Sequence, residues 1–159
     1  MLTRPPKIYI DSSVVAACCD PKYRRWSKSL LENFRSGLYK PVISELVQAE
    51  MAEAPEEVYV AYDELMNCDP RVLEVTEKAD ALADLYVERK VLDEKYYFEA
   101  LHIALATLAE VDVFVSLDHP HVLHFLQVRG FVTVNLEMGL KPIQIRCPRL
   151  LASYDRESC

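Results

Sequence analysis

Four carboxylate residues stand where chemistry is expected. Three of them come directly after short apolar runs, and the fourth interrupts a long apolar stretch; they are Asp11, Glu45, Asp118 and Glu99. Oxygen ligands without a nearby cysteine or paired histidines suit a hard ion such as Mg²⁺ or Mn²⁺. An ion of this kind activates water and stabilises charge on a phosphoryl group. If the four acids converge, the residue types therefore predict hydrolysis of a phosphodiester.

The elements that must position these acids are short strands alternating with helices. Apolar runs rich in β-branched and aromatic residues predict strands over 7–10, 41–43, 71–75, 113–117 and 131–134, and a last edge strand over 143–146. Helical spacing and cap signals predict helices over 14–19, 20–36, 45–54, 56–66, 77–90, 93–109 and 121–128. Strands separated by helical crossovers pair in parallel, so we expect a three-layer α/β/α sandwich with a mainly parallel central sheet.

The predicted topology brings the acids to one place. In an open parallel sheet the ligand site lies beyond the carboxyl ends of the strands, where Asp11, Glu45 and Asp118 all fall. Glu99 joins them if the first turns of its helix reach that edge. Because that helix is apolar on nearly every face, its carboxylate needs a compensating cation, and we expect a positive group beside Glu99.

Length and composition limit the classes of protein that the chain can be. At 159 residues with 51% apolar residues, it fits one globular domain over 1–159. Three glycines and the absence of a glycine-rich phosphate-binding motif exclude a nucleotide-binding loop. Five cysteines without a C-x-x-C pair favour buried thiols, with one at the terminus, over a zinc site. No stretch resembles a signal peptide or a membrane span, so we expect a cytoplasmic protein.

Charge is distributed unevenly along the chain. The formal net charge of −7 combines +5 over residues 1–40, −14 over 41–118 and +2 over 119–159. An acidic protein does not bind nucleic acid nonspecifically through its net charge. A local basic surface formed by the first forty residues remains compatible with nucleic-acid binding.

Four segments of the sequence resemble a known family when they are taken together and in order. They are Ile8-Tyr9-Ile10-Asp11-Ser12, Ile43-Ser44-Glu45-Leu46, Glu99-Ala100-Leu101-His102-Ile103-Ala104 and Val113-Phe114-Val115-Ser116-Leu117-Asp118. These segments are similar to the four acidic motifs of PIN-domain ribonucleases, and the stretch 134–146 resembles the closing part of such proteins. The resemblance implies a PIN-like fold over roughly the whole chain.

The resemblance also carries expectations about function. Many small PIN-domain proteins are toxins of the VapC type, which cut RNA with Mg²⁺ or Mn²⁺ and are held inactive by a cognate antitoxin. It implies that the four acids, Asp11, Glu45, Glu99 and Asp118, bind the metal and are catalytic. At one position the chain departs from the family, because Glu99 stands where an aspartate is usual.

Several further residues have both a functional and a structural interpretation. Ser12, Arg24, Arg25 and His121 are candidates for RNA contacts, while Trp26 between its charged neighbours fits a core position. Asp11 alone is equally a helix cap, and Glu45 alone is a first-turn acid that satisfies a helix dipole. His102 shares a helix face with Glu99, and we favour a hydrogen-bonded core histidine over a site residue.

Two other functions stay open at this point. A catalytically silent PIN-like module that binds RNA or a protein partner is compatible with Glu99 and the acidic surface. An aspartyl-phosphate enzyme is disfavoured, because Ser13 stands where a second acid is required. Apolar and aromatic residues on the helices at 23–34 and 56–66, including Tyr59 and Tyr62, are candidates for an antitoxin surface or a homodimer face.

Overall fold

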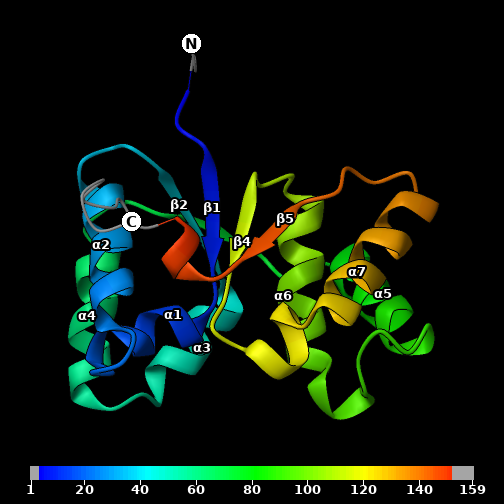
Figure 1. Ribbon diagram of the computed structural model, residues 1–159, viewed down its shortest axis with the longest axis horizontal. Coiled ribbons are helices and arrows are strands. Elements are labelled where there is room, and N and C mark those ends of the chain that lie inside the picture. The colour runs from blue at the N-terminus through cyan, green and yellow to red at the C-terminus, as the bar shows by residue number, and fades with distance from the viewer. Residues whose placement is uncertain (1–3, 152–159) are drawn as a thin grey trace.

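A five-stranded sheet forms the centre of the protein in the computed structural model, which describes residues 4–151 (Figure 1). Its strands are β1 (Lys7–Ile10), β2 (Lys40–Ser44), β3 (Arg71–Leu73), β4 (Val113–Val115) and β5 (Gln144–Arg146). They lie in the order β3-β2-β1-β4-β5, and every neighbouring pair is parallel. The predicted parallel sheet is thus confirmed, with the last strand at one edge as expected.

Helices cover both faces of this sheet, which gives the expected three-layer α/β/α architecture (Figure 1). On one side lie α1 (Ser12–Ala16), α2 (Arg24–Arg35), α3 (Glu45–Ala52) and α4 (Glu56–Met66). On the other lie α5 (Glu77–Glu88), α6 (Tyr97–Leu108) and α7 (Phe125–Glu137). Short helical turns at 17–19, 94–96, 119–123 and 148–150 complete the connections.

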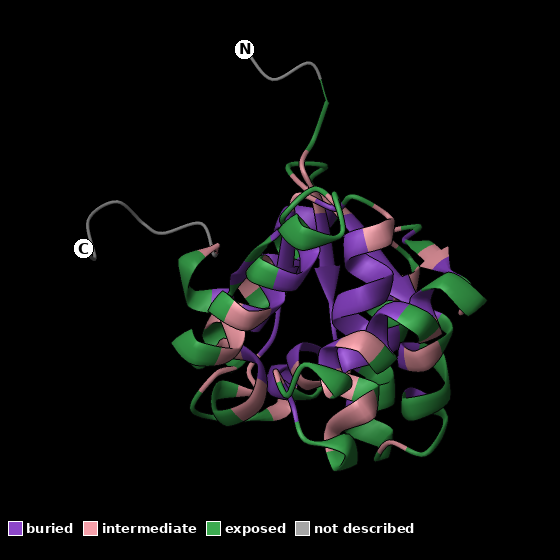
Figure 2. Ribbon diagram, turned by 90° about the vertical axis from the view of Figure 1, so that its right-hand side faces the viewer, coloured by how far each residue is buried: buried purple, intermediate pink, exposed green. Residues whose placement is uncertain are grey.

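Two hydrophobic clusters, one on each face, hold the layers together. Side chains of a strand alternate between faces, so Ile8 and Ile10 pack in the cluster against α1–α4, while Tyr9 packs against α5–α7. β2 divides in the same way, with Ile43 on the first face and Val42 on the second. Buried residues accordingly concentrate in the sheet and on the inner faces of the helices (Figure 2). Strands buried on both faces explain why these runs are continuously apolar.

Local cap signals place several helix boundaries correctly. α4 begins directly after Pro55, and Thr76 caps α5 by accepting a hydrogen bond from the Ala79 N–H. α2 begins at Arg24, later than expected, because residues 21–23 form a turn.

None of the four described cysteines forms a disulfide, and Cys159 lies outside the described residues.

The strand predicted over 131–134 is wrong, since these residues lie inside α7. The predicted helix over 121–128 is divided between the 119–123 turn and the start of α7. Phe131 and Val134 are buried at helical spacing, so burial against α5 and α6 outweighs the β-propensity of this run. Buried Asn135 anchors the helix by accepting from the Tyr86 hydroxyl and donating to Thr107. Gly130 permits close packing, because a Cβ there would lie 2.8 Å from a Val91 methyl carbon.

Candidate active site

A pocket lies at the carboxyl ends of the central strands. These strand ends form the lower edge of the sheet in Figure 1. Three of the four predicted acids, Asp11, Glu99 and Asp118, line it. Asp11 follows β1 and Asp118 lies just beyond β4, and these two strands are paired neighbours. The prediction that a parallel sheet brings these acids to one edge is therefore met for three of the four.

Two helices supply the remaining walls, each with one face. α3 and the residue after it contribute Leu46, Ala49, Glu50 and Glu53. α6 and the turn before it contribute Lys95, Phe98, Glu99 and His102. Both sets have the spacing i, i+3, i+4, i+7, which places their members on a single helix face. The pocket thus lies between two helix faces and the ends of two strands.

Glu45 does not reach this pocket, which corrects the fourth predicted position. It is exposed at the first turn of α3, and its carboxylate accepts a hydrogen bond of 2.9 Å from the Val75 N–H. Glu50 lines the pocket in its place. The two residues differ because the facing side of α3 is set by how the helix packs, whereas the sequence shows only that Glu45 follows the strand. The helical spacing with Leu46 and Ala49 is the signal that could have identified Glu50.

Asp11 is the most deeply placed acid of the pocket. Its side chain is an N-cap of α1, accepting from the N–H of Ser13 at 3.1 Å and from the Ser13 hydroxyl. Ser13 in turn accepts from the N–H of Leu117 at 3.0 Å, which joins α1 to the segment after β4. Burial raises the pKa of Asp11 above its ordinary value, and the charge of His102 offsets this only in part. The cap and site interpretations therefore coexist, and a cation would relieve the cost of this buried charge.

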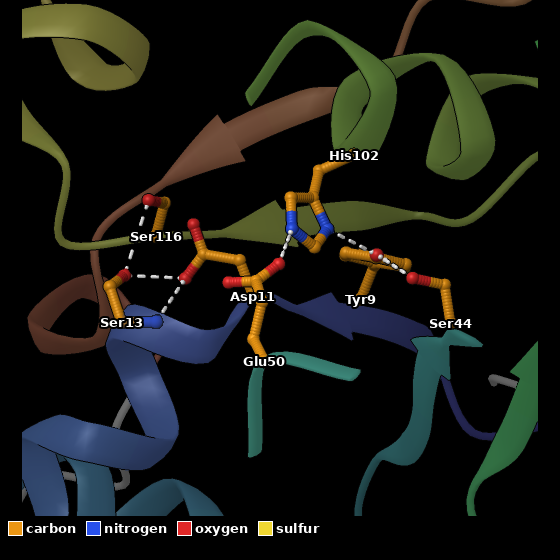
Figure 3. Close-up of polar contacts among 7 residues, drawn as sticks. All are labelled: Tyr9, Asp11, Ser13, Ser44, Glu50, His102 and Ser116. Atoms are coloured by element: carbon orange, nitrogen blue, oxygen red, sulfur yellow. Dashed lines mark hydrogen bonds and ion pairs between the residues drawn. The ribbon is translucent and has the colours of Figure 1, made fainter. Parts of the chain in front are cut away.

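Glu50 is held by a histidine at the pocket wall (Figure 3). Its Oε1 lies 2.8 Å from Nε2 of His102, whose side chain is only 6% exposed. The other ring nitrogen of His102, Nδ1, lies 2.6 Å from the Tyr9 hydroxyl. Burial acts to raise the pKa of Glu50, but the hydrogen bond and charge of His102 outweigh it, so that the pKa is lowered. His102 is thus a hydrogen-bonded core histidine, as favoured from the sequence, and it also lines the pocket.

Asp118 is held by a second histidine, within one turn of chain. Its Oδ1 accepts from the N–H of His121 and lies 2.9 Å from Nδ1 of the same residue. The His121 ring also stacks on Tyr96, with ring centroids 3.7 Å apart. His121, predicted to contact substrate, therefore lies against an acid of the pocket without being one of its lining residues.

Glu99 is only half-buried, although the helix that follows it is buried from Ala100 to Thr107. Lys95, four residues earlier, lines the same pocket, but its Nζ lies over the Tyr96 ring at 5.2 Å, and no ion pair joins it to Glu99 within the described residues. Phe98 stands beside them with 62% of its surface exposed. An acidic pocket with a lysine and an exposed aromatic ring at its wall has the components that bind a nucleotide.

Ser12 is the one other predicted substrate residue that lines the pocket. Its hydroxyl oxygen is buried next to the Glu50 carboxylate, and hydrogen bonding from Ser12 helps to lower the pKa of Glu50. Arg24 and Arg25 are exposed at the start of α2 and are absent from the pocket lining. Trp26 is half-buried, with the guanidinium of Arg149 over its ring at 5.6 Å.

The predicted partner surface is only partly present. Tyr59 on α4 is 44% exposed, and its neighbour Val60 is 54% exposed. Tyr62 is buried in the core cluster, as are Leu30 and Phe34 of α2. These three side chains therefore stabilise the fold and are not available to a partner.

The acids do not form a closed metal cage. Among the described residues, no three Asp, Glu, His or Cys side chains lie close enough together to hold a metal ion. Mg²⁺ does not require such a cage, because it usually binds one or two carboxylates directly and keeps several water molecules. The donor set of carboxylate oxygens beside the Ser12 hydroxyl fits a hydrated cation of this type.

Comparison with known proteins bears on the fold. No family model matches the sequence, and no curated protein matches it. Among solved structures, the chain is similar to a chain in the crystal structure of VapBC2 from Rickettsia felis bound to a DNA fragment from their promoter. The TM-score is 0.53 at 10% sequence identity, over 89% of this chain and 98% of that chain. At this identity the likeness concerns the fold, and it supports a PIN-like, VapC-like architecture.

No helix within the described part of the chain has the length and apolar character needed to span a membrane.

Proposed function

We propose that the protein is a divalent-cation-dependent endoribonuclease and the toxin of a toxin–antitoxin pair. The observation that carries this proposal is the convergence of Asp11, Glu50, Glu99 and Asp118 on one pocket, in a fold similar to that of a VapBC2 chain. Repulsion among the acids of this pocket, which Glu53 also lines, is relieved when a divalent cation binds among them.

The cation is Mg²⁺ or Mn²⁺, because the available ligands are carboxylate and hydroxyl oxygens. One or two of the four acids hold it directly, and the others act through bound water. When present, the ion supplies an activated water and charge stabilisation at the phosphate. Asp11, Glu50, Glu99 and Asp118 are the residues that would hold the ion.

RNA is the substrate class that fits the pocket walls. Lys95 is placed to pair with a backbone phosphate, and the exposed ring of Phe98 offers a stacking surface for a base. Such stacking needs an unpaired base, so we expect cleavage within single-stranded regions.

The direct test is RNA cleavage by the purified chain with Mn²⁺. We expect Asp11→Asn and Glu50→Gln each to reduce the rate by more than about 100-fold, because each weakens transition-state stabilisation by several kcal/mol. Glu45→Gln is the matched control, since it changes an acid of the same helix that lies outside the pocket; its rate should stay within about 3-fold of wild type. Cleavage that survives both pocket substitutions would contradict the proposal.

A catalytically silent module is the second candidate. It is favoured by the open arrangement of the acids and by the hydrogen bond that already occupies one oxygen of Glu50. This alternative predicts RNA or protein binding without turnover under any divalent cation. Multiple turnover by the wild-type chain, lost in Asp11→Asn, excludes it.

The partner expected for a toxin is a cognate antitoxin. The exposed apolar side chains of α4, Tyr59 and Val60, are the part of the predicted surface that remains available. Co-expression with the product of the adjacent open reading frame tests this assignment. We expect a stable complex with reduced RNA cleavage, and Tyr59→Ser with Val60→Ser should weaken the complex without reducing cleavage by the isolated chain.

A further inference from the structure

A chain of three hydrogen bonds runs from the sheet to the pocket (Figure 3). The Ser44 hydroxyl lies 2.7 Å from the Tyr9 hydroxyl, which lies 2.6 Å from Nδ1 of His102. Nε2 of His102 then lies 2.8 Å from Oε1 of Glu50. The four members come from β2, β1, α6 and α3, so the chain joins both sides of the sheet to the pocket wall.

The direction of the hydrogen bond between His102 and Glu50 follows from the charge of Glu50. An ionised Glu50 can only accept, so Nε2 of His102 must carry the proton. Nδ1 of the same ring pairs with the Tyr9 hydroxyl, and that hydroxyl in turn pairs with the Ser44 hydroxyl. Burial raises the pKa of Tyr9 above its ordinary value, so the hydroxyl keeps its proton and can donate. The chain therefore ends in an N–H of His102 that donates to Glu50.

The network also explains why Ser44 does not act as a side-chain cap. Ser44 is the N-cap residue of α3 by position, but its side chain makes no capping hydrogen bond. It is fully buried and bonds to Tyr9 instead. Ser44 thus makes a tertiary hydrogen bond in place of the local capping bond that is usual for a serine at this position. The network therefore belongs to the folded site.

We propose that His102 is a positioning residue, which holds the Glu50 carboxylate turned into the pocket so that it is ordered before a cation arrives. The proposal rests on the proposed function, because it assigns Glu50 to cation binding. The Glu50 side chain is 44% exposed, whereas that of His102 is 6% exposed. A glutamate on an exposed helix face is otherwise free to adopt many rotamers, and ordering it upon binding would weaken cation affinity. Partners of metal-binding side chains have this orienting effect in general.

Two conservative variants separate positioning from packing. The amide nitrogen of a glutamine lies near the position of Nε2, so His102→Gln keeps a donor for Glu50. An asparagine reaches only as far as Nδ1, so His102→Asn keeps a partner for Tyr9 and loses the bond to Glu50. Tyr9→Phe keeps His102 and Glu50 but removes the hydroxyl that bonds to Nδ1 of His102. If either His102 variant fails to fold, Tyr9→Phe replaces it as the test. Tyr9→Phe should weaken Mn²⁺ binding by about 3-fold or more.

The experiment is calorimetric titration of Mn²⁺ into the full chain. We expect His102→Asn to weaken Mn²⁺ binding by about 10- to 100-fold and His102→Gln to stay within about 3-fold of wild type. In a Glu50→Gln background, His102→Asn should have no further effect, because its influence passes through Glu50. Equal Mn²⁺ affinity in all three proteins, or equal weakening in both variants, would overturn the positioning role.

A second measurement distinguishes failure of this inference from failure of the proposed function. Side-chain couplings of Glu50 measured by NMR without metal should show one rotamer in wild type and His102→Gln, and averaging in His102→Asn. If wild type binds no Mn²⁺, the proposed function fails, and these couplings alone decide whether His102 orders Glu50. The same couplings in all three proteins would overturn the inference whatever the Mn²⁺ affinity.

Discussion

Two acid–histidine pairs stand at the carboxyl edge of the sheet, and they are built in opposite ways. The inner pair, Glu50 and His102, joins residues 52 positions apart, and its histidine is 6% exposed. The outer pair, Asp118 and His121, joins residues three positions apart, with side chains 20% and 30% exposed. The inner pair therefore exists only when the whole fold is in place, whereas the outer pair needs only one turn of chain.

Each pair is supported by a tyrosine, but through different physics. Tyr9 supports His102 through its hydroxyl, which bonds to Nδ1 in a buried site. Tyr96 supports His121 through its ring, which is stacked at 3.7 Å. Buried hydrogen bonds are costly to break, and exposed stacking is not. We therefore expect two acid–histidine contacts at the same edge of the sheet to differ several-fold in their contribution to the free energy of unfolding.

Removal of each histidine should produce the largest difference. We expect His102→Ala to lower the free energy of unfolding by about 3 kcal/mol, because it leaves a cavity and removes one of the two hydrogen-bond partners of the buried Tyr9 hydroxyl. His121→Ala should cost less than about 1 kcal/mol. In thermal denaturation this corresponds to a loss of about 10 °C against a loss of at most about 3 °C. Equal losses would show that the two pairs are equivalent.

Removal of each tyrosine hydroxyl is the next test. Tyr9→Phe keeps the ring stacked on Phe114 but removes the hydroxyl from between Ser44 and His102. We expect a loss of about 1 to 2 kcal/mol in urea denaturation. Tyr96→Phe keeps the stacked ring and should change stability by less than about 0.5 kcal/mol. A larger effect at Tyr96 would reverse the comparison.

Asp11 can be compared with the two acids that are paired with histidines because, within the described residues, its own hydrogen-bond partners include no histidine. Its pKa is raised on folding by burial, so its charge opposes folding above that pKa and has no effect once the acid is protonated in both states. Asp11→Asn should therefore raise the melting temperature of the metal-free protein at neutral pH by about 2 to 4 °C. The gain should shrink as the pH falls toward the ordinary carboxyl range.

Glu45→Gln provides the control for this measurement, because Glu45 is an exposed acid outside the pocket. It should leave the melting temperature unchanged within about 1 °C. Destabilisation by Asp11→Asn would show that the Asp11 charge is already compensated without a cation.

Exchange of the ring protons should show the smallest but most local difference. His102 is buried and its Nε2 proton is held in a hydrogen bond to Glu50, so we expect a separate, slowly exchanging signal in proton NMR near neutral pH. The His121 ring is partly exposed, and its proton should exchange too fast to observe. A visible His121 signal with none for His102 would contradict the assigned order of the two pairs.

The positions of the strands could be predicted from the sequence, and the strand ends in turn place two of the four acids of the site. Asp11 and Asp118 are placed by strand ends alone, because parallel strands share a carboxyl edge. Glu50 was missed because its facing side depends on how α3 packs, which strand order does not determine. The partners of His102 lie 52 and 93 positions away, so no local pattern could reveal them. The segment 131–134 misled for a related reason, since its β-branched residues pack in a helix through tertiary contacts.

The order of strands in the sheet has a consequence for synthesis. The central strand β1 is made first, and it bonds to β2 long before it can meet β4; the Lys7 N–H waits for an Asp112 carboxylate 105 positions later. Pairings this distant in sequence form late, since loop closure must precede them. Asp11 and Glu50 thus leave the ribosome well before Glu99 and Asp118. A product that ends before α6 carries Asp11 and Glu50 on one wall of the pocket and lacks the opposite wall, which α6 supplies.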